Sequence, residues 1–369
     1  MIINPGETVN AAANGFKLWY NILVPALLPF FIIAELMVNI GLVRFIGVLL
    51  EPIMRPLFKL PGCSSLVVVM GFTSGFPVGA ILSKKLYEEN MLTANETERL
   101  VSFTNNSSPL FIIGAIGIGM FNSAAFGYLL AASHYLANLL VGLFWRFKAI
   151  TPVIPKENKV TIKSAFSQLV NAQTAGIGKI LGDAIRNSIN NILAIAGFII
   201  FFSVLTRMLI VWGIMDYFAL LVSNYLAFLN IPYPVAYGLG IGLFEVTLGA
   251  NTISITNSEP IIKLLTVSLL LAFSGFSIIA QVMSVVATAP VRFSFYLKSR
   301  LLQISLSLVF TYLGYHLFLK NAHHIPAISS LPYYKILYGF DAWTFSITCL
   351  VIGLCIIAIL MFISILINN

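Results

Sequence analysis

Charged residues are scarce in this chain of 369 amino acids, and their scarcity excludes a soluble globular protein. Only 9% of the residues are Asp, Glu, Lys or Arg, whereas 59% are hydrophobic. A soluble domain usually carries about 25% charged residues, because its surface must face water. A chain of this length could not cover itself with so few charges. A lipid bilayer removes that requirement, so the composition predicts an integral membrane protein.

Cysteines are few, and recognisable metal-ligand clusters and catalytic motifs are lacking. The three cysteines, Cys63, Cys349 and Cys355, are odd in number and have no CxxC or CxxH spacing, which favours neither a disulfide framework nor a metal site. His323 and His324 lie in a polar stretch without an acid or cysteine at ligand spacing. No Walker motif, HExxH or GxSxG is present. The sequence therefore predicts a protein that is not an enzyme and has no metal or cofactor.

Long apolar windows, in contrast, are abundant. Four of them reach the roughly 20 residues that cross the hydrocarbon core of a bilayer. They are Leu18–Ile40, Ile192–Trp212, Leu264–Ala289 and Phe345–Ile367. They predict an all-α, multi-pass membrane protein whose first partner is the lipid bilayer. The net charge of +8 fits basic cytoplasmic loops and does not indicate nucleic-acid binding.

The sequence resembles itself at a shift of about 170 residues, which is the mark of an internal repeat. The matching segments are Asn21–Leu23 with Asn191–Leu193, Leu60–Pro61 with Ile231–Pro232, Gly71 with Gly242, Gly79–Ala80 with Gly249–Ala250, and Ser102–Asn105 with Ala272–Gly275. Several weak matches at one offset predict two related halves. The chain then divides into a first membrane repeat (1–145), a basic linker (146–190), a second repeat (191–319), and an outer loop with a last membrane helix (320–369).

Basic residues orient these halves. The linker carries seven of them and should lie in the cytoplasm, while its part from Phe166 to Ile185 has the spacing of an amphipathic helix on the membrane surface. Counting spans outward from the linker puts 16 of the 21 Lys and Arg residues inside. The two repeats then begin on opposite sides of the membrane. The sequence thus predicts inverted repeats, a recurrent architecture of secondary transporters.

Each half contains a short apolar segment interrupted by glycine, Ser64–Ser83 in the first and Tyr237–Ser254 in the second. The stretch Gly71–Gly79 has three glycines and a proline, which would break a continuous helix. Broken backbone inside a membrane must be buried in protein or face water. We therefore predict a re-entrant helical hairpin in each half. The alternative is a tightly packed pair of glycine-rich helices.

A polar break follows each hairpin within an otherwise apolar helix, at Thr104–Pro109 in the first half and at Ser274–Ser277 in the second. Amides and hydroxyls at membrane depth need partners, which a substrate could supply. Hydrogen bonds between helices are the alternative. The candidate substrate-binding residues of the hairpins and breaks are Thr73, Ser74, Gly75, Asn105, Asn106, Ser107, Ser108, Glu245, Thr247, Asn251, Ser274, Ser277 and Gln281.

Two acids lie within apolar sequence, Glu245 on the second predicted hairpin and Glu35 near the inner end of the first helix. An intramembrane carboxylate is costly and is by default a functional candidate. Glu245 could bind a cation, carry a proton or hydrogen-bond a ligand; alternatively it pairs with a hairpin N–H or with Arg207. A coupling proton and a coupling sodium ion both fit the sequence.

Several of these segments resemble those of a known family. They are Ser74–Ala80, Arg99–Gly114, Gly182–Ile189, Gly242–Gly249 and Phe273–Val282. The resemblance extends roughly from Leu18 to Leu319. It is to the family of the sporulation integral membrane protein YlbJ, within the nucleoside-recognition Gate superfamily.

The resemblance implies transport of dipicolinic acid across the outer forespore membrane of endospore-forming bacteria. Dipicolinate is a flat pyridine with two carboxylates, and the N-terminal ends of broken helices offer N–H groups to such an anion. An ionised Glu245 would repel this substrate, so it would have to be protonated, paired or part of a co-ion site. The alternatives are a transporter of nucleosides or similar polar heterocycles, and a structural membrane protein that transports nothing. Whether the chain forms a homo-oligomer stays open.

Overall fold

The computed structural model describes residues 3–40, 42–149, 177–225 and 231–319, and every regular element within these ranges is helical. The predicted all-α class is confirmed. Four helices of the described part are long and apolar enough to cross a membrane, Ala124–Lys148, Gly178–Val211, Pro260–Val285 and Phe293–Leu319. The predicted span Phe345–Ile367 and most of the predicted linker lie outside the described residues.

The first half consists of a long helical run, a connecting helix, a helical hairpin, a broken helix and a long final helix. The elements in chain order are α1 (Pro5–Leu18), the π-helical segment η1 (Trp19–Leu23), α2 (Val24–Asn39), α3 (Leu42–Phe58), α4 (Ser64–Thr73), α5 (Val78–Glu88), α6 (Ala94–Thr104), the π-helical segment η2 (Leu110–Met120), α7 (Ala124–Trp145) and the short turn η3 (Arg146–Lys148). Here α4 and α5 form the hairpin, while α6 and η2 form the broken helix.

The second half repeats this order. Its elements are α9 (Ile177–Val211), α10 (Ile214–Tyr225), α11 (Tyr233–Phe244), α12 (Val246–Ser254), α13 (Pro260–Phe273), α14 (Gly275–Val285), α15 (Phe293–Gly314) and the π-helical segment η5 (Tyr315–Leu319). The hairpin is now α11 with α12, and the broken helix is α13 with α14. Each hairpin and each break thus falls in the segment where glycine and polar residues interrupt the apolar sequence.

Helix α9 is longer than the sequence analysis predicts. Its 35 residues extend about 52 Å at the usual rise of 1.5 Å per residue. Residues 177–190, which the sequence analysis places in the linker, continue into the membrane span without interruption. The described part of the predicted surface helix therefore belongs to this long helix, because no proline ends the helical pattern between the two segments.

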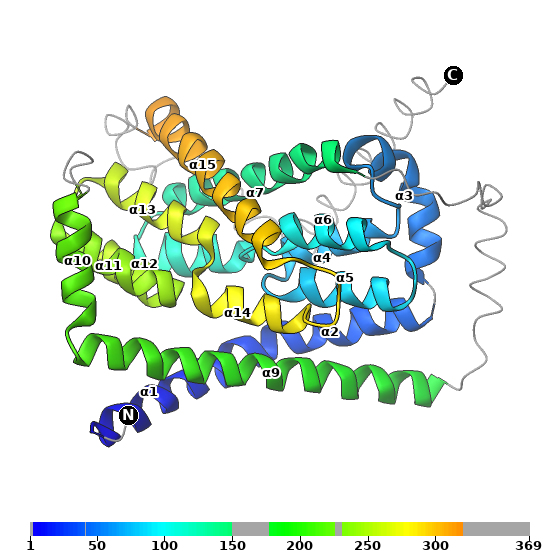
Figure 1. The fold of residues 1–369 in the computed structure, drawn as a ribbon, viewed down its shortest axis with the longest axis horizontal. Coiled ribbons are helices and arrows are strands. Elements are labelled where there is room, and N and C mark those ends of the chain that lie inside the picture. Colours follow the sequence, from blue (N-terminus) through cyan, green and yellow to red (C-terminus); the bar gives the residue numbers. More distant parts are fainter. Residues whose placement is uncertain (1–2, 41, 150–176, 226–230, 320–369) are drawn as a thin grey trace, which may run out of the picture.

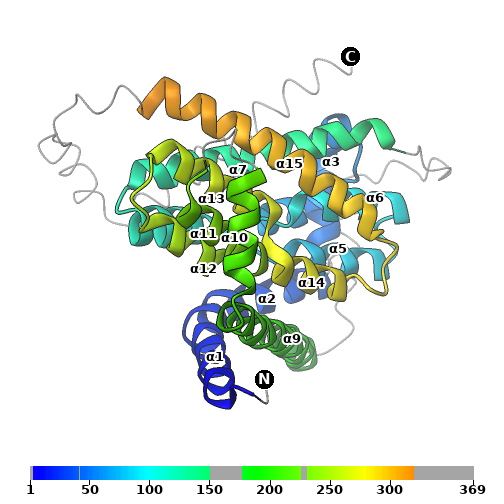
Figure 2. The same ribbon diagram turned by 60° about the vertical axis from the view of Figure 1, so that its left-hand side comes forward.

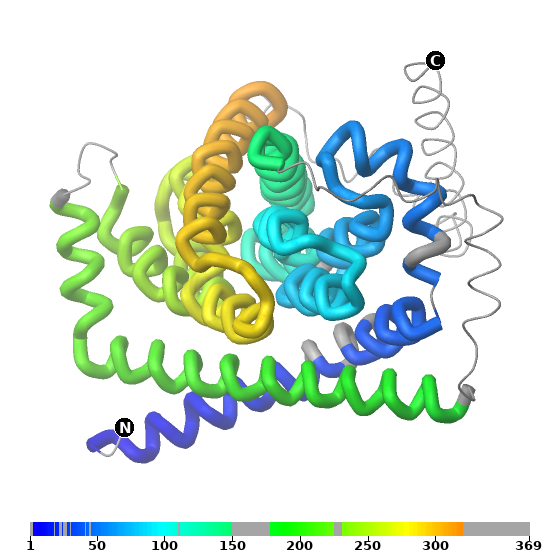
Figure 3. The backbone as a smooth tube through the Cα atoms, turned by 45° about the vertical axis from the view of Figure 1, so that its right-hand side comes forward, coloured from blue at the N-terminus to red at the C-terminus, as the bar shows by residue number. Residues whose placement is uncertain are grey.

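The helices that follow the first run of each half lie at opposite ends of the molecule. Figure 1 shows α3 at one end of the longest axis and α10 at the other, with α9 running between them. Helices α1 and α2 pack along α9 (Figures 1 and 2). The remaining helices of the two halves lie side by side above α9 (Figure 3). This core contains both hairpins and both broken helices.

The two halves contact each other through matched pairs of helices. Helix α5 of the first hairpin packs against α14, and α12 of the second hairpin packs against η2. In the same way α6 contacts α15 and α13 contacts α7, while α7 and α15 pack together. Buried apolar side chains from both halves form shared clusters here; Ile112 and Val246 belong to one, and Ala80 and Val282 to another. Each half therefore places the second part of its broken helix on the hairpin of the other half.

Candidate substrate site at the helix breaks

The first hairpin turns at Ser74–Pro77, where residues that disfavour helix follow one another. Gly75 has a φ of +90°, which only glycine adopts readily, and the Phe76–Pro77 peptide bond is cis. Helix α4 therefore stops before the turn and α5 starts after it. The turn places Ser74 in the interior, and its hydroxyl has no hydrogen-bond partner in the part of the chain that the structure describes.

Helix α6 stops at Thr104, beside this turn. The next residue, Asn105, is buried and has an extended conformation. Its Oδ1 accepts a hydrogen bond from the Ala80 N–H at 3.0 Å, and its Nδ2 donates to the Val101 carbonyl at 2.8 Å. One amide thus satisfies a free N–H in the first turn of α5 and a free carbonyl in the last turn of α6. Asn105 thereby ties the hairpin to the break.

Glycines let the hairpin reach this break. A Cβ on Gly71 would lie 2.2 Å from the Thr104 carbonyl oxygen, and a Cβ on Gly79 would lie 2.4 Å from the same atom. Both arms of the hairpin therefore contact the end of α6 through bare backbone. A Cβ on Gly75 would lie 3.2 Å from the Cβ of Ser108, whose hydroxyl accepts a backbone N–H of η2 at 3.3 Å. The turn, the break and the start of η2 thus form one compact unit.

The residues after Asn105 complete a buried polar cluster. Asn106 has no exposed surface; its Nδ2 donates to the Phe103 carbonyl at 3.3 Å, and its Oδ1 has no partner among the described residues. The Ser107 N–H donates to His134 Nε2 at 3.3 Å, and the Ser107 carbonyl accepts a hydrogen bond from the Tyr135 hydroxyl at 2.8 Å. Helix α7, which carries His134 and Tyr135, therefore holds the broken backbone in place.

Helix α15 of the second half also reaches this break. Arg300 donates from Nη1 to the Asn105 carbonyl at 3.2 Å, and from Nη2 to the Ser102 carbonyl at 2.5 Å and to Asn138 Oδ1 at 3.3 Å. The Gln303 amide nitrogen lies 3.4 Å from the other ring nitrogen of the histidine on α7. Both side chains have no exposed surface. The break in the first half is thus completed by side chains from the second half.

Sequence reasoning missed these supporting residues. It did not select His134 as a ligand, and it counted Arg300 among the cytoplasmic basic residues, whereas Arg300 is fully buried. The available signal was the helical spacing of polar residues within apolar spans, His134 with Asn138 and Arg300 with Gln303. One such pair alone is also what a hydrogen bond between membrane helices looks like.

In the second half the hairpin turns at Glu245. The carboxylate accepts the Thr247 N–H at 3.1 Å and the Leu248 N–H at 2.7 Å, so it caps α12, the following arm of its own hairpin. A negative charge at a helix N-terminus also complements the helix dipole. This is the hairpin N–H role that the sequence left as an alternative. The other alternative is wrong, because Arg207 pairs with Glu7 at 2.7 Å.

The second broken helix is interrupted by a left-handed turn. Ser274 and Gly275 have φ values of +76° and +73°. A Cβ on Gly275 would lie 3.1 Å from the side chain of Val246, so this turn lies against the tip of the second hairpin. Beyond it, Gln281 Nε2 donates to Ser277 Oγ at 3.3 Å within α14, and both side chains are buried. Hairpin and break meet in this half too, but through apolar contact, while the hydrogen bonds described here stay within the hairpin or within α14.

Two of the predicted site residues lie apart from these clusters. Thr73 is exposed, and its hydroxyl donates to the Val69 carbonyl at 2.8 Å within its own helix. Asn251 is exposed on α12. The other candidates gather in two groups, around the first break (Ser74, Gly75, Asn105, Asn106, Ser107 and Ser108) and around the second (Glu245, Thr247, Ser274, Ser277 and Gln281).

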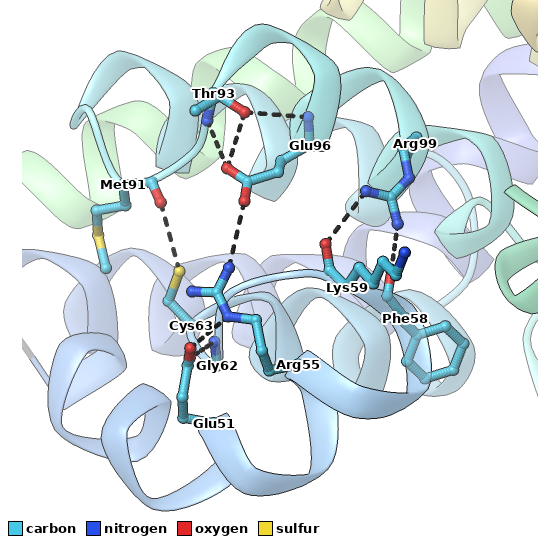
Figure 4. A network of polar contacts seen from close by, with 10 residues as sticks. All are labelled: Glu51, Arg55, Phe58, Lys59, Gly62, Cys63, Met91, Thr93, Glu96 and Arg99. Atoms are coloured by element: carbon cyan, nitrogen blue, oxygen red, sulfur yellow. Dashed lines mark hydrogen bonds and ion pairs between the residues drawn. The ribbon is translucent and has the colours of Figure 1, made fainter. Parts of the chain in front are cut away.

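A polar network fixes the start of α6 against α3 (Figure 4). Thr93 and Glu96 form a capping box, in which the Thr93 N–H donates to Glu96 Oε2 at 2.9 Å. Arg55 pairs with Glu96 at 3.7 Å and with Glu51 at 2.6 Å. The buried Arg99 donates to two carbonyls at the end of α3. The helix that leads to the first break is therefore held at both of its ends.

The buried Glu35 has a partner on the first hairpin. Its carboxylate lies 2.7 Å from Lys85 Nζ on α5, and Asn187 Nδ2 on α9 donates to the same oxygen at 3.2 Å. This contact joins the hairpin to α2 and α9. Within the described ranges, no three His, Cys, Asp or Glu side chains gather as a metal site would require.

Comparison with known families defines the class of the protein. Residues 22–132 match the Gate family model, which is described as nucleoside recognition, and the four membrane-length helices of the described residues make the chain a multi-pass membrane protein with a Gate domain. The chain is 41% identical over 321 residues to the sporulation integral membrane protein YlbJ of Bacillus subtilis, over 85% of this chain and 79% of that protein. The chain therefore belongs to the YlbJ family, and the resemblance found in its motifs is confirmed.

A second relative matches a smaller part of the chain. An uncharacterised protein of Alkalihalophilus pseudofirmus is 36% identical over 123 residues, which cover 31% of this chain and 26% of that protein. No solved structure matches the chain.

Proposed function

We propose that the protein is a secondary transporter of dipicolinic acid, a small aromatic dicarboxylate, in the outer forespore membrane. The observation that carries the proposal is the hydroxyl of Ser74 beside the first break, which is buried and has no hydrogen-bond partner among the residues that the structure describes. Buried polar groups are nearly always hydrogen-bonded, and a carboxylate of a bound solute would supply the missing acceptor. Membership of a family whose named member is a sporulation membrane protein supports this cargo.

The same proposal includes two inverted repeats with re-entrant hairpins. The placement of α3 and α10 at opposite ends of the molecule supports the inversion (Figure 1). The matched contacts between the halves also support it, because α5 packs against α14 and the equivalent α12 packs against η2. Backbone broken at membrane depth has to be enclosed by protein, and both breaks pack against a hairpin tip. Paired broken helices are the usual position of a transport site.

A nucleoside or a similar polar heterocycle is the second candidate substrate. One observation favours it, namely the Oδ1 of Asn106, which no described residue pairs with. This oxygen is a hydrogen-bond acceptor, so it fits an N–H or O–H group, which a nucleoside has and a fully ionised dipicolinate lacks. The description of the Gate family model as nucleoside recognition agrees with this candidate.

Uptake by purified protein in liposomes tests the proposal. Labelled dipicolinate and a labelled nucleoside are offered in parallel, and we expect uptake of dipicolinate. Ser74→Ala should abolish that uptake without changing membrane insertion, whereas Thr73→Ala is the matched control, because the neighbouring hydroxyl is exposed and bonded within its own helix. Uptake of neither solute would make the chain a structural membrane protein. Preferred uptake of the nucleoside would replace the substrate.

The energy source is tested in the same liposomes. Coupling to a proton or to a sodium ion requires that an imposed gradient of that ion drives accumulation of the solute. We expect one of the two gradients to raise the final internal concentration above the external one. Uptake that only equilibrates under both gradients would make the protein a facilitator instead of a secondary transporter.

A further inference from the structure

Arg300 is a buried cation with no acidic partner in the described part of the chain. Its side chain has 0% exposure, and the ion pairs of the described chain all join other residues. Its hydrogen bonds go to neutral oxygens, the carbonyls of Ser102 and Asn105 and the Oδ1 of Asn138. The ring of Tyr296 lies 5.1 Å from the guanidinium carbon. These neutral groups orient the charge but do not cancel it.

A buried charge of this kind is costly, because the protein replaces only part of the hydration that the charge loses. Arg99 is the closest comparison, since it is also buried and also donates to carbonyls at a helix end. That arginine, however, lies beside a network that contains the carboxylates of Glu51 and Glu96 (Figure 4). No carboxylate of the described chain bonds to Arg300. A counter-ion from outside the chain would offset its charge.

We propose that Arg300 is the fixed positive charge that makes the first break selective for an anion. This inference rests on the transport function proposed above and assigns its charge preference to one residue. The arginine holds the Ser102 and Asn105 carbonyls and so neutralises the negative end of α6. The N-terminal ends of α5 and η2 then meet at the break without an opposing negative charge. Because Arg300 is fully buried, it acts as a positioning and electrostatic residue and does not itself contact the solute.

The second half has a carboxylate at the tip of its hairpin, where the first half has a neutral amide. There the carboxylate of Glu245 occupies the N-terminus of α12, so that position already holds an anion. In the first half the N-terminus of α5 is capped by the neutral amide of Asn105. An anionic group of a solute should therefore bind on the side of the first break. The uncharged part of the solute, or a cation bound together with it, should lie toward the second break.

Asn138→Asp is the sharpest test, because it cancels the charge of Arg300 without removing the arginine. Asn138 Oδ1 already lies 3.3 Å from Nη2, so a carboxylate of the same shape would form an ion pair there. Binding of dipicolinate and of its neutral diamide is measured by competition with labelled dipicolinate and by thermal shift. We expect the affinity for dipicolinate to fall roughly tenfold or more, as for loss of a unit charge within about 10 Å. The affinity for the diamide should change less than about twofold.

Three further variants separate charge from packing. Arg300→Gln should lose the preference for the dianion as well. Arg300→Lys keeps the charge but not the fork that reaches two carbonyls, so it should keep the preference and melt at a lower temperature. Arg99→Gln is the matched control, since it removes a buried helix-capping arginine away from the break; it should lower the melting temperature and leave the preference unchanged.

The outcomes distinguish this inference from the function on which it rests. A wild-type ratio of dipicolinate to diamide affinity in Asn138→Asp and Arg300→Gln overturns the role of Arg300 and leaves a dipicolinate transporter standing. Wild-type protein that binds neither ligand overturns both. If Arg300→Gln does not fold, Asn138→Asp decides, because it retains the arginine and its bonds to both carbonyls.

Discussion

The two halves have the same order of elements, but they close their helix breaks in different ways. In the first half the closing hydrogen bonds join distant residues: Asn105 to Ala80, Ser107 to His134, and Arg300 of the other half to Asn105. In the second half they are local, within Glu245–Leu248 and within α14. The first break is therefore tied to three other elements, whereas the second hairpin and break meet through apolar contact.

This difference predicts a division of labour. Separating the first hairpin from its break would part the Ala80 N–H from the Oδ1 of Asn105. A buried polar group left unpaired in this way costs about 1–3 kcal/mol. Separating the second hairpin from its break leaves the capping bonds of Glu245 intact, because these bonds lie within the hairpin. We therefore expect the second hairpin to be the part that opens to the solute, and the first to be the fixed binding wall.

The relative orientation of the halves gives the largest expected effect, because labelling is all or none. Glu89 and Asn257 are exposed residues in the loops that follow the two hairpins. With inverted repeats, Glu89→Cys reacts with a membrane-impermeant maleimide only from the cytoplasmic side and Asn257→Cys only from the other side. Reaction of both from one side would make the repeats parallel.

The labelling background can keep one native cysteine. Burial raises the pKa of the Cys63 thiol to about 12, so almost none of it is the reactive thiolate at pH 7. Cys349 and Cys355 lie outside the described residues and are replaced by serine. Protein without an introduced cysteine should then remain unlabelled on both sides.

Close backbone contacts give the next largest effect. Gly79→Ala would place a Cβ 2.4 Å from the Thr104 carbonyl oxygen, and Gly249→Ala would place one 2.2 Å from the Gly242 Cα. The first substitution would push the first hairpin away from its break. The second would push apart the two arms of the second hairpin. Both should cost at least about 1–3 kcal/mol of stability, visible as lost folded yield in size-exclusion chromatography.

Gly197→Ala on α9 is the control for these two substitutions, because a Cβ at this position would meet no neighbouring atom of the described residues within 4 Å. It should fold like the wild type, since alanine favours helix more than glycine does. Normal yield and melting temperature of Gly79→Ala would show that the first hairpin does not depend on this contact.

The ion pair of the first hairpin should give an intermediate effect. Lys85→Met leaves the carboxylate of Glu35 buried with only the Asn187 amide as a partner, which should cost about 2 kcal/mol. The neighbouring Lys84→Met removes only a surface pair with Glu88 and should cost less than about 0.5 kcal/mol. Thermal unfolding in detergent measures both. Equal melting temperatures of the two variants would contradict a stabilising tether between Lys85 and Glu35.

Substituting the side chains that cap α5 and α12, Asn105 and Glu245, should give the smallest difference in stability between the two halves. Asn105→Ala leaves the Ala80 N–H and the Val101 carbonyl unpaired and should cost about 1–3 kcal/mol. Glu245→Gln keeps an oxygen that can cap α12 and should cost less than about 1 kcal/mol. The melting temperatures should fall in that order. If Glu245→Gln keeps its melting temperature but loses ion-driven uptake, the acid serves the coupling ion.

Much of the candidate site could be predicted from sequence because its residues interrupt the helices themselves. Gly75 and Pro77 end one helix by their own backbone preferences, and the run after Thr104 ends another. The roles of individual side chains could not be predicted in the same way. Glu245 looked like a ligand-binding acid because it is ionisable in apolar sequence, but its carboxylate reaches N–H groups two and three residues ahead.

The sequence by itself determined the membrane class, the helical content and the places where the helices break. These properties follow from composition and from local backbone chemistry, and they need no knowledge of distant partners. Only the tertiary structure decided which groups meet at the breaks. Asn105 finds Ala80, and Arg300 finds Ser102, because packing brings together residues far apart in the chain. The charge at the first break therefore arises only when the two halves pack together. The arginine comes from one half, and the carbonyls that it holds come from the other.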